Sequence, residues 1–151
     1  GQTTPQMLSR FERDVLDVHP KAVLILAGTN DIAGNTGEIT LTEIRDNIDE
    51  MAQMASKHHI QVILCSVLPA FDYPWRGGRR PDEKIPALNQ LIRELAEEQN
   101  LYYLDFFTVM ADDRKGLPKD LAEDGVHPTP KGYAVMRNLT LETFKELKLI
   151  P

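Results

Sequence analysis

Residues 22–31 read AVLILAGTND, a run of six apolar residues followed at once by a polar turn. A short continuous apolar run is typical of a strand that is buried on both faces of a sheet. Similar runs occur at residues 61–68 (QVILCSVL) and 101–105 (LYYLD). The sequence therefore predicts three buried strands.

Segments with apolar residues at helical spacing lie before, between and after these strands, at residues 4–16, 40–55, 85–95 and 129–147. Residues 69–84 contain three prolines, two glycines and three arginines, which predicts a long loop. The alternation of helices and strands predicts an α/β fold, in which helices cover both faces of a parallel sheet. Ligands of such sheets bind at the carboxyl ends of the strands. We therefore expect the site in the loops after Ala27, Ser66 and Asp105.

The composition excludes several classes of protein. The 151 residues carry 17 basic and 23 acidic side chains and a net charge of −6, which disfavours binding to nucleic acid. The single cysteine, Cys65, excludes a disulfide framework and a multi-cysteine zinc site, and we expect it to be a buried apolar residue. No apolar run approaches the length of a membrane span. No repeat or linker divides the chain, so residues 1–151 are expected to form one domain.

Two short clusters carry chemistry. The first is Gly28-Thr29-Asn30-Asp31, directly after the first predicted strand. The glycine permits a sharp turn, and the Asn30 amide is a donor of the kind that stabilises a developing oxyanion. An ordinary Asn/Asp turn is the alternative interpretation.

The second cluster is Asp124-Gly125-Val126-His127-Pro128. A carboxylate three residues before a histidine can accept the imidazole Nδ1–H and leave Nε2 free to act as a general base. The alternative is a surface turn before the last helix, in which both side chains are solvated.

Together with Gly1-Gln2-Thr3, these clusters resemble three sequence blocks of the SGNH/GDSL hydrolase superfamily, in the same chain order. The resemblance implies a flavodoxin-like, three-layer α/β/α fold. It also implies a serine esterase or acylhydrolase that needs no cofactor or metal and acts on a small ester, such as an acetylated carbohydrate or a lysophospholipid.

The resemblance also assigns roles to residues. His127 would be the general base and Asp124 its orienting partner, while the Gly1 N–H and the Asn30 amide would form the oxyanion hole. The family's G-D-S block, which carries the nucleophilic serine, is absent. The serines that are present are Ser9, Ser56 and Ser66, and none occupies the nucleophile position, although Ser66 lies near the expected site.

We therefore expect an N-terminally incomplete domain that lacks the first strands of the family fold and whose nucleophile lies outside the chain. The exposed sheet edge that results could pair with a second copy. A non-catalytic binding module or an inactive fragment is the alternative. Localisation stays open, because the sequence offers no signal that decides it.

Further candidates are weaker. Phe71, Tyr73, Trp75 and Arg76 follow the second strand and could form a wall for the substrate, although an exposed loop explains them equally well. Asp31 is a further candidate for substrate binding, although capping of the next helix or bracing of the loop is the favoured interpretation. His58 and His59 lack nearby partners that would complete a metal site.

Overall fold

Three parallel strands form the centre of the computed structural model, which describes residues 1–151. They are β1 (Ala22–Ile25), β2 (Gln61–Cys65) and β3 (Tyr102–Leu104), in the spatial order β1-β2-β3. The predicted parallel sheet is thus confirmed. Each strand is shorter than its apolar run because the chain leaves the sheet before the run ends.

The side chains of β2 alternate between the two faces of the sheet, as the pleat requires. Val62 and Leu64 belong to a core cluster of 22 buried residues, which β2 shares with the helices below it. Ile63 and Cys65 belong to a second cluster of eight buried residues on the opposite face. Burial on both faces explains why this segment is apolar without interruption.

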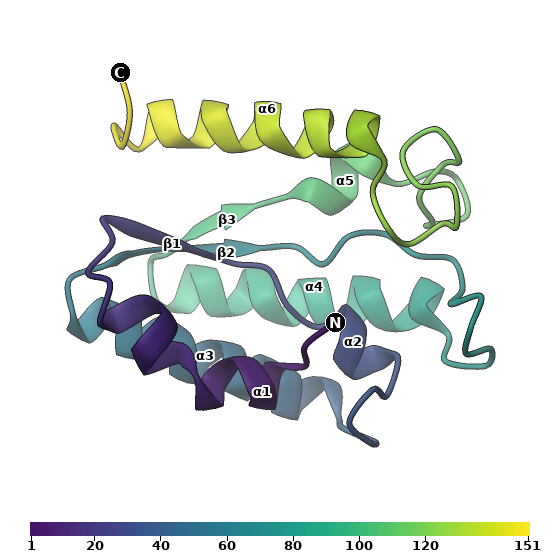
Figure 1. Cartoon of the computed structure of the whole chain (residues 1–151), viewed down its shortest axis with the longest axis horizontal. Coiled ribbons are helices and arrows are strands. Elements are labelled where there is room, and N and C mark those ends of the chain that lie inside the picture. Colours follow the sequence, from purple (N-terminus) through teal and green to yellow (C-terminus); the bar gives the residue numbers. More distant parts are fainter.

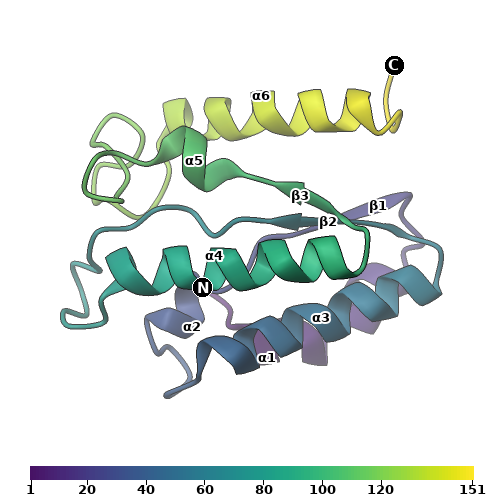
Figure 2. The ribbon, with the colours of Figure 1, turned by 180° about the vertical axis from the view of Figure 1, so that it is seen from behind.

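Helices cover both faces of the sheet. They are α1 (Thr4–Ser9), the π-helix η1 (Glu12–Leu16), α2 (Thr29–Ile32), α3 (Leu41–Lys57), α4 (Pro81–Glu98), α5 (Phe106–Met110) and α6 (Pro130–Glu146). Figure 1 shows α5 and α6 on one face and α1, α3 and α4 on the other, and the reverse view in Figure 2 agrees. The three-layer α/β/α arrangement is confirmed.

The three long helices begin at the signals that the sequence offers. Thr40 accepts a hydrogen bond from the backbone N–H of Glu43 at 3.1 Å and starts α3 with a capping box. Thr129 caps α6 in the same way, by accepting from the N–H of Gly132 at 3.2 Å. The helix α4 begins at Pro81, four residues earlier than its apolar periodicity predicts, because proline is favoured in the first turn.

Other boundaries differ from the prediction. The single helix expected at residues 4–16 is divided into α1 and the π-helix η1, with a turn at Arg10. The short helices α2 and α5 stand where only loops were expected. Both are too short to show a periodic pattern.

The two outer strands of the sheet are β1 and β3. Figure 1 shows α6 running above the sheet, where it packs on the β3 side of the molecule. β1 pairs only with β2, so its outer edge is open. Beside this edge, Val18 is 66% and Leu26 37% exposed. An open edge with apolar residues beside it is a surface on which another strand could pair.

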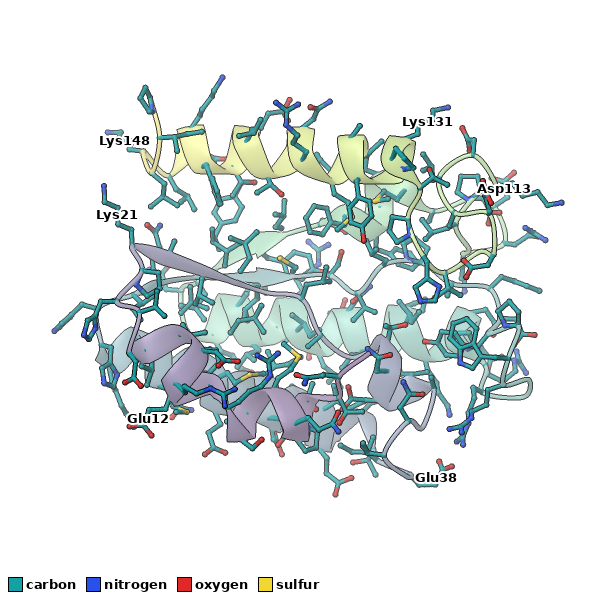
Figure 3. All side chains as sticks on the ribbon, in the orientation of Figure 1. Glu12, Lys21, Glu38, Asp113, Lys131 and Lys148 are labelled. Carbon is teal, nitrogen blue, oxygen red and sulfur yellow. The ribbon has the colours of Figure 1, made fainter.

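Charged side chains occupy the outside of the molecule. Figure 3 shows the labelled Glu12, Lys21, Glu38, Lys131 and Lys148 at its periphery. No helix combines the length and the apolar character that crossing a membrane would require.

Candidate active site

The loops that follow the three strands come together at one end of the molecule. In Figure 1 this is the right-hand end, where α2 follows β1, the long loop follows β2, and the connection between α5 and α6 returns to the sheet. Figure 2 shows the same grouping at the left. These are the carboxyl ends of the parallel strands, where the sequence predicts the site.

Asp124 and His127 form a hydrogen-bonded pair in the turn before α6. The imidazole Nδ1 lies 2.7 Å from Oδ2 of Asp124. The other carboxylate oxygen, Oδ1, accepts from the backbone N–H groups of Val126 at 2.9 Å and His127 at 2.8 Å. Gly125 makes the turn possible because its φ of +79° is unfavourable for other residues. One oxygen therefore shapes the turn while the other orients the ring.

The pairing determines the tautomer of His127. The hydrogen bond to the imidazole, followed by those from the backbone N–H groups, lowers the pKa of Asp124 to about 2. The carboxylate is then ionised at neutral pH and can only accept, so Nδ1 carries the proton. Nε2 keeps its lone pair, and the side chain of His127 is 73% exposed. The ring can therefore accept a proton from a group placed beside it.

Asn30 lies in the first turn of α2, and both ends of its amide are held. Its Nδ2 donates to the backbone carbonyl of Gln2 at 3.0 Å, and its Oδ1 accepts from Nδ2 of Asn35 at 2.9 Å. Because an amide nitrogen carries two hydrogens, one N–H of Asn30 is left for a further acceptor.

Gly28 makes this position of α2 possible. Its φ is +127°, and a Cβ there would lie 2.6 Å from Cδ2 of Leu88 in α4. The close approach lets the chain turn from β1 into α2 directly above the core.

The first residues of the chain are tied to α2 by Asp31. Its carboxylate accepts from the backbone N–H of Thr4 at 2.9 and 3.0 Å and from the Thr4 hydroxyl at 2.6 Å. Asp31 is only 3% exposed, and this burial raises its pKa, although the Thr4 hydrogen bonds act in the opposite direction. These bonds hold Gly1 and Gln2 next to Asn30.

A cavity of about 110 Å³ lies between the two clusters. Gln2 and Asn30 line it on one side, and Val126, the neighbour of His127, lines it on another. Most of the remaining lining is apolar and comes from the end of β1 and from the segment after β2, including Leu68 and Pro69. Residues far apart in the sequence thus surround one space.

The four candidates of the long loop have different environments. Trp75 lies beside His127, with ring centroids 5.4 Å apart. Tyr73 is 1% exposed, and its hydroxyl lies 2.8 Å from Oγ1 of Thr29 and donates to the Thr29 carbonyl at 3.0 Å. Arg76 donates to the backbone carbonyls of Ala33 and Gly34, in the turn after α2. Phe71 lies next to Arg114, whose guanidinium is 5.2 Å from its ring.

None of the three serines reaches His127 in a hydrogen bond. Ser9 and Ser56 lie on α1 and α3 and are exposed. Ser66 is completely buried, and its hydroxyl accepts from the backbone N–H of Phe107 at 2.8 Å. The hydroxyl of Ser66 therefore fastens the start of α5 to the end of β2.

Cys65 is buried, as expected, and burial raises the pKa of its thiol to about 12. Histidine, cysteine, aspartate and glutamate side chains form no group of three that could hold a metal ion.

Sequence reasoning missed several residues that support the site. Thr4 is one, because nothing in the sequence pairs it with a residue 27 positions away. Thr29, the partner of Tyr73, is another. The apolar character of the strands gives no information about these polar contacts. The only indication in the sequence is that Thr4 lies close to Gly1, and Thr29 next to Asn30, along the chain.

Comparison with known proteins adds to this geometry. Residues 1–135 match the family described as GDSL-like lipase/acylhydrolase. The crystal structure of a GDSL-like lipase from Bacteroides thetaiotaomicron superposes with a TM-score of 0.93 at 38% identity. That alignment covers 97% of this chain and 72% of the Bacteroides chain.

Two more distant relatives extend the comparison. An uncharacterized lipoprotein of Bacillus subtilis, YqeF, is 26% identical over 90% of this chain and 67% of its own length. The structure of an acetyl xylan esterase, AlAXEase, superposes with a TM-score of 0.77 at 20% identity, covering 94% of this chain and 76% of that one. At this identity the second likeness shows the fold alone.

Proposed function

Because the chain belongs to the GDSL-like lipase/acylhydrolase family, we propose that its site hydrolyses carboxylic esters by a Ser-His-Asp mechanism. The observation that supports this most directly is the 2.7 Å contact between Asp124 and His127, next to a cavity that Asn30 lines together with Val126, the neighbour of His127. A base, its orienting carboxylate and an oxyanion donor are the groups that acyl transfer needs.

In this mechanism a serine oxygen bonds to the acyl carbon of the ester while its proton moves to Nε2 of His127. His127 then gives that proton to the leaving alcohol. A water molecule, activated by the same nitrogen, releases the acid and restores the serine. Asp124 keeps the ring in place and stabilises the imidazolium that forms.

Negative charge develops on the carbonyl oxygen during both steps. The free N–H of Asn30 and the backbone N–H of Gly1 are the proposed donors to this oxygen. Removing one donor of this type typically lowers turnover by about 10²–10³. Asp31 acts indirectly, because its bonds to Thr4 hold Gly1 and Gln2 beside Asn30.

The nucleophile in this proposal is a serine outside residues 1–151. The environments of the serines within the chain support this, since two are exposed on helices and Ser66 is buried against Phe107. Residues 1–151 alone would therefore have the base and an oxyanion donor but no hydroxyl to activate.

The proposed substrates are esters of short acyl groups with sugars, or lysophospholipids. We also propose that the open edge of β1 pairs with a second copy of the chain, because unpaired strand edges attract other strands.

Labelling with a fluorophosphonate probe tests the mechanism, since the probe reacts with activated serines. The protein encoded by the complete gene is labelled and digested, and the modified residue is mapped by mass spectrometry. We expect a label on a serine outside residues 1–151, and we expect His127→Asn to prevent labelling. His19→Asn is the matched control, because His19 is an exposed histidine with a φ of +50° that asparagine tolerates.

Two results would contradict the proposal. A label on Ser66 would place the nucleophile within the chain. No label on any serine would favour the non-catalytic binding module instead.

A further inference from the structure

The segment Asp72–Arg79, which we name the strap, is fastened to the loop that carries Asn30. Its first anchor is Tyr73, whose buried hydroxyl bonds to Thr29. The second is Arg76, which donates to the carbonyls of Ala33 at 3.0 Å and Gly34 at 2.6 Å.

The third anchor is Arg79, which pairs with Glu38. Its guanidinium lies so close to Gly34 that a Cβ there would be 2.7 Å from Nη2. The strap is therefore held from both sides of Trp75, and its position is set before any ligand arrives.

Trp75 lies between these anchors, but its side chain does not pack into the hydrophobic core. The indole is 51% exposed although it is the largest side chain in the strap. Its ring centroid lies 5.6 Å from that of Tyr73 and 5.4 Å from that of His127. An exposed aromatic ring that is held rigidly beside the proposed base can bind a ligand at little cost in side-chain entropy.

The cavities near Trp75 and His127 suit one kind of ester better than another. The mainly apolar cavity beside Asn30 has a volume of about 110 Å³, which suits a short acyl group. His127 itself lines a second, open groove of about 360 Å³, whose other lining residues are polar apart from two prolines. A long acyl chain needs an extended apolar groove, whereas a polyhydroxylated ring suits a polar groove beside an aromatic face.

We propose that Trp75 is the binding platform for a sugar ring, and that the site accepts short-chain acyl esters of carbohydrates. The inference rests on the proposed ester hydrolysis, which it narrows to one substrate class. The apolar face of a pyranose ring packs on the indole, while the acyl group enters the cavity beside Asn30. The hydroxyl groups of the sugar then face the polar groove.

Calorimetric titration of residues 1–151 tests the platform, because binding requires no nucleophile. The probe is partially acetylated xylotriose, and lysophosphatidylcholine below its micellar concentration is the comparison. We expect the sugar ester to bind and Trp75→Leu to weaken it about tenfold or more, since both apolar contact and aromatic stacking are lost. Trp75→Phe keeps an aromatic face and is expected to recover most of the affinity.

The matched control is Tyr133→Leu, which removes another exposed aromatic ring, located on α6 and lining a different groove. It should bind the probe as the wild type does. Circular dichroism of each variant verifies the fold, which the half-exposed Trp75 does not hold together.

The proposal is overturned if Trp75→Leu binds the sugar ester as tightly as the wild type, or if only the lysophospholipid binds in a Trp75-dependent manner. Absence of sugar binding by the wild type overturns it as well. A different result would contradict ester hydrolysis while leaving the binding platform intact. In that case the sugar ester would bind through Trp75, but fluorophosphonate labelling would give no modified serine.

Discussion

At the scale of single residues, Asp124 performs two tasks with its two oxygens, since one holds the backbone turn and the other orients the imidazole. We predict that Asp124→Asn shifts His127 toward the tautomer that carries its proton on Nε2, because the amide no longer demands a donor at Nδ1. Nitrogen-15 NMR of the imidazole ring at pH 8 measures the tautomer. Asp120→Asn, which alters a nearby carboxylate that pairs with Lys131, should leave it unchanged. Identical tautomers in wild type and Asp124→Asn would contradict the prediction.

The same carboxylate predicts a pH dependence. The pKa of Asp124 falls from its ordinary 3.8 to about 2 in the folded chain. A lowered carboxyl pKa stabilises the fold above the unfolded value, and that contribution is lost as the pH falls through the folded value. We therefore expect the stability difference between wild type and Asp124→Asn to be constant above pH 4 and to shrink between about pH 4 and 2. Urea unfolding at several pH values measures it, and a difference that grows with acidity would refute the argument.

Gly28 is the glycine at which an added side chain should reduce the free energy of unfolding most. Alanine there combines a φ of +127° with a Cβ 2.6 Å from Leu88. We expect Gly28→Ala to reduce the free energy of unfolding by about 2–4 kcal/mol. Gly77→Ala is the control, because nothing lies within 4 Å of its added Cβ, and its change should be close to zero. Equal urea midpoints for the two variants would show that the Leu88 side chain moves away from the added Cβ without a loss of stability.

At the scale of elements, the strap depends on Tyr73 for its attachment to α2. Burial raises the pKa of Tyr73 to about 12, so its hydroxyl stays protonated and keeps donating to Thr29 at all ordinary pH values. We predict that Tyr73→Phe costs about 1–2 kcal/mol, since two hydrogen bonds are lost and the Thr29 hydroxyl is left without its partner, although the Thr29 carbonyl still accepts from the Ala33 N–H.

Urea unfolding gives the stability, and amide hydrogen exchange shows whether the loss is concentrated in the strap. Tyr102→Phe, which removes the hydroxyl that donates to Glu146 at the surface, should cost less. Uniformly faster exchange across the chain would mean that Tyr73 supports the core rather than the strap.

The elements also show what a single sequence can and cannot predict. The strands and the long helices were predictable because burial on two faces, or on one, produces a repeating apolar pattern over many residues. The helices α2 and α5 have four and five residues, too few for such a pattern. The pairing of Asp124 with His127 was predictable because the partners are three residues apart. The contacts of Asp31 with Thr4 and of Tyr73 with Thr29 join distant segments, and only the folded chain brings them together.

At the scale of the whole molecule, the open edge of β1 determines how copies of the chain meet. We predict that residues 1–151 associate at high concentration and that Leu26→Lys shifts them toward monomer, because a charge beside an open edge opposes strand pairing. Sedimentation velocity over a range of concentrations measures the association. Val109→Lys changes an apolar residue on α5 that is more exposed than Leu26, and it should have no effect. A wild type that stays monomeric throughout would remove the case for pairing at β1.

Trp75 is the only tryptophan in the chain, which gives its position beside His127 a practical value. The intrinsic fluorescence of the whole protein excited at long ultraviolet wavelength originates from a single indole, and that indole lies next to the proposed base. Emission intensity and wavelength therefore report on the candidate site without any attached dye. A ligand that covers the ring, or a change of solvent around it, is therefore detected as a change in the emission of the unlabelled protein.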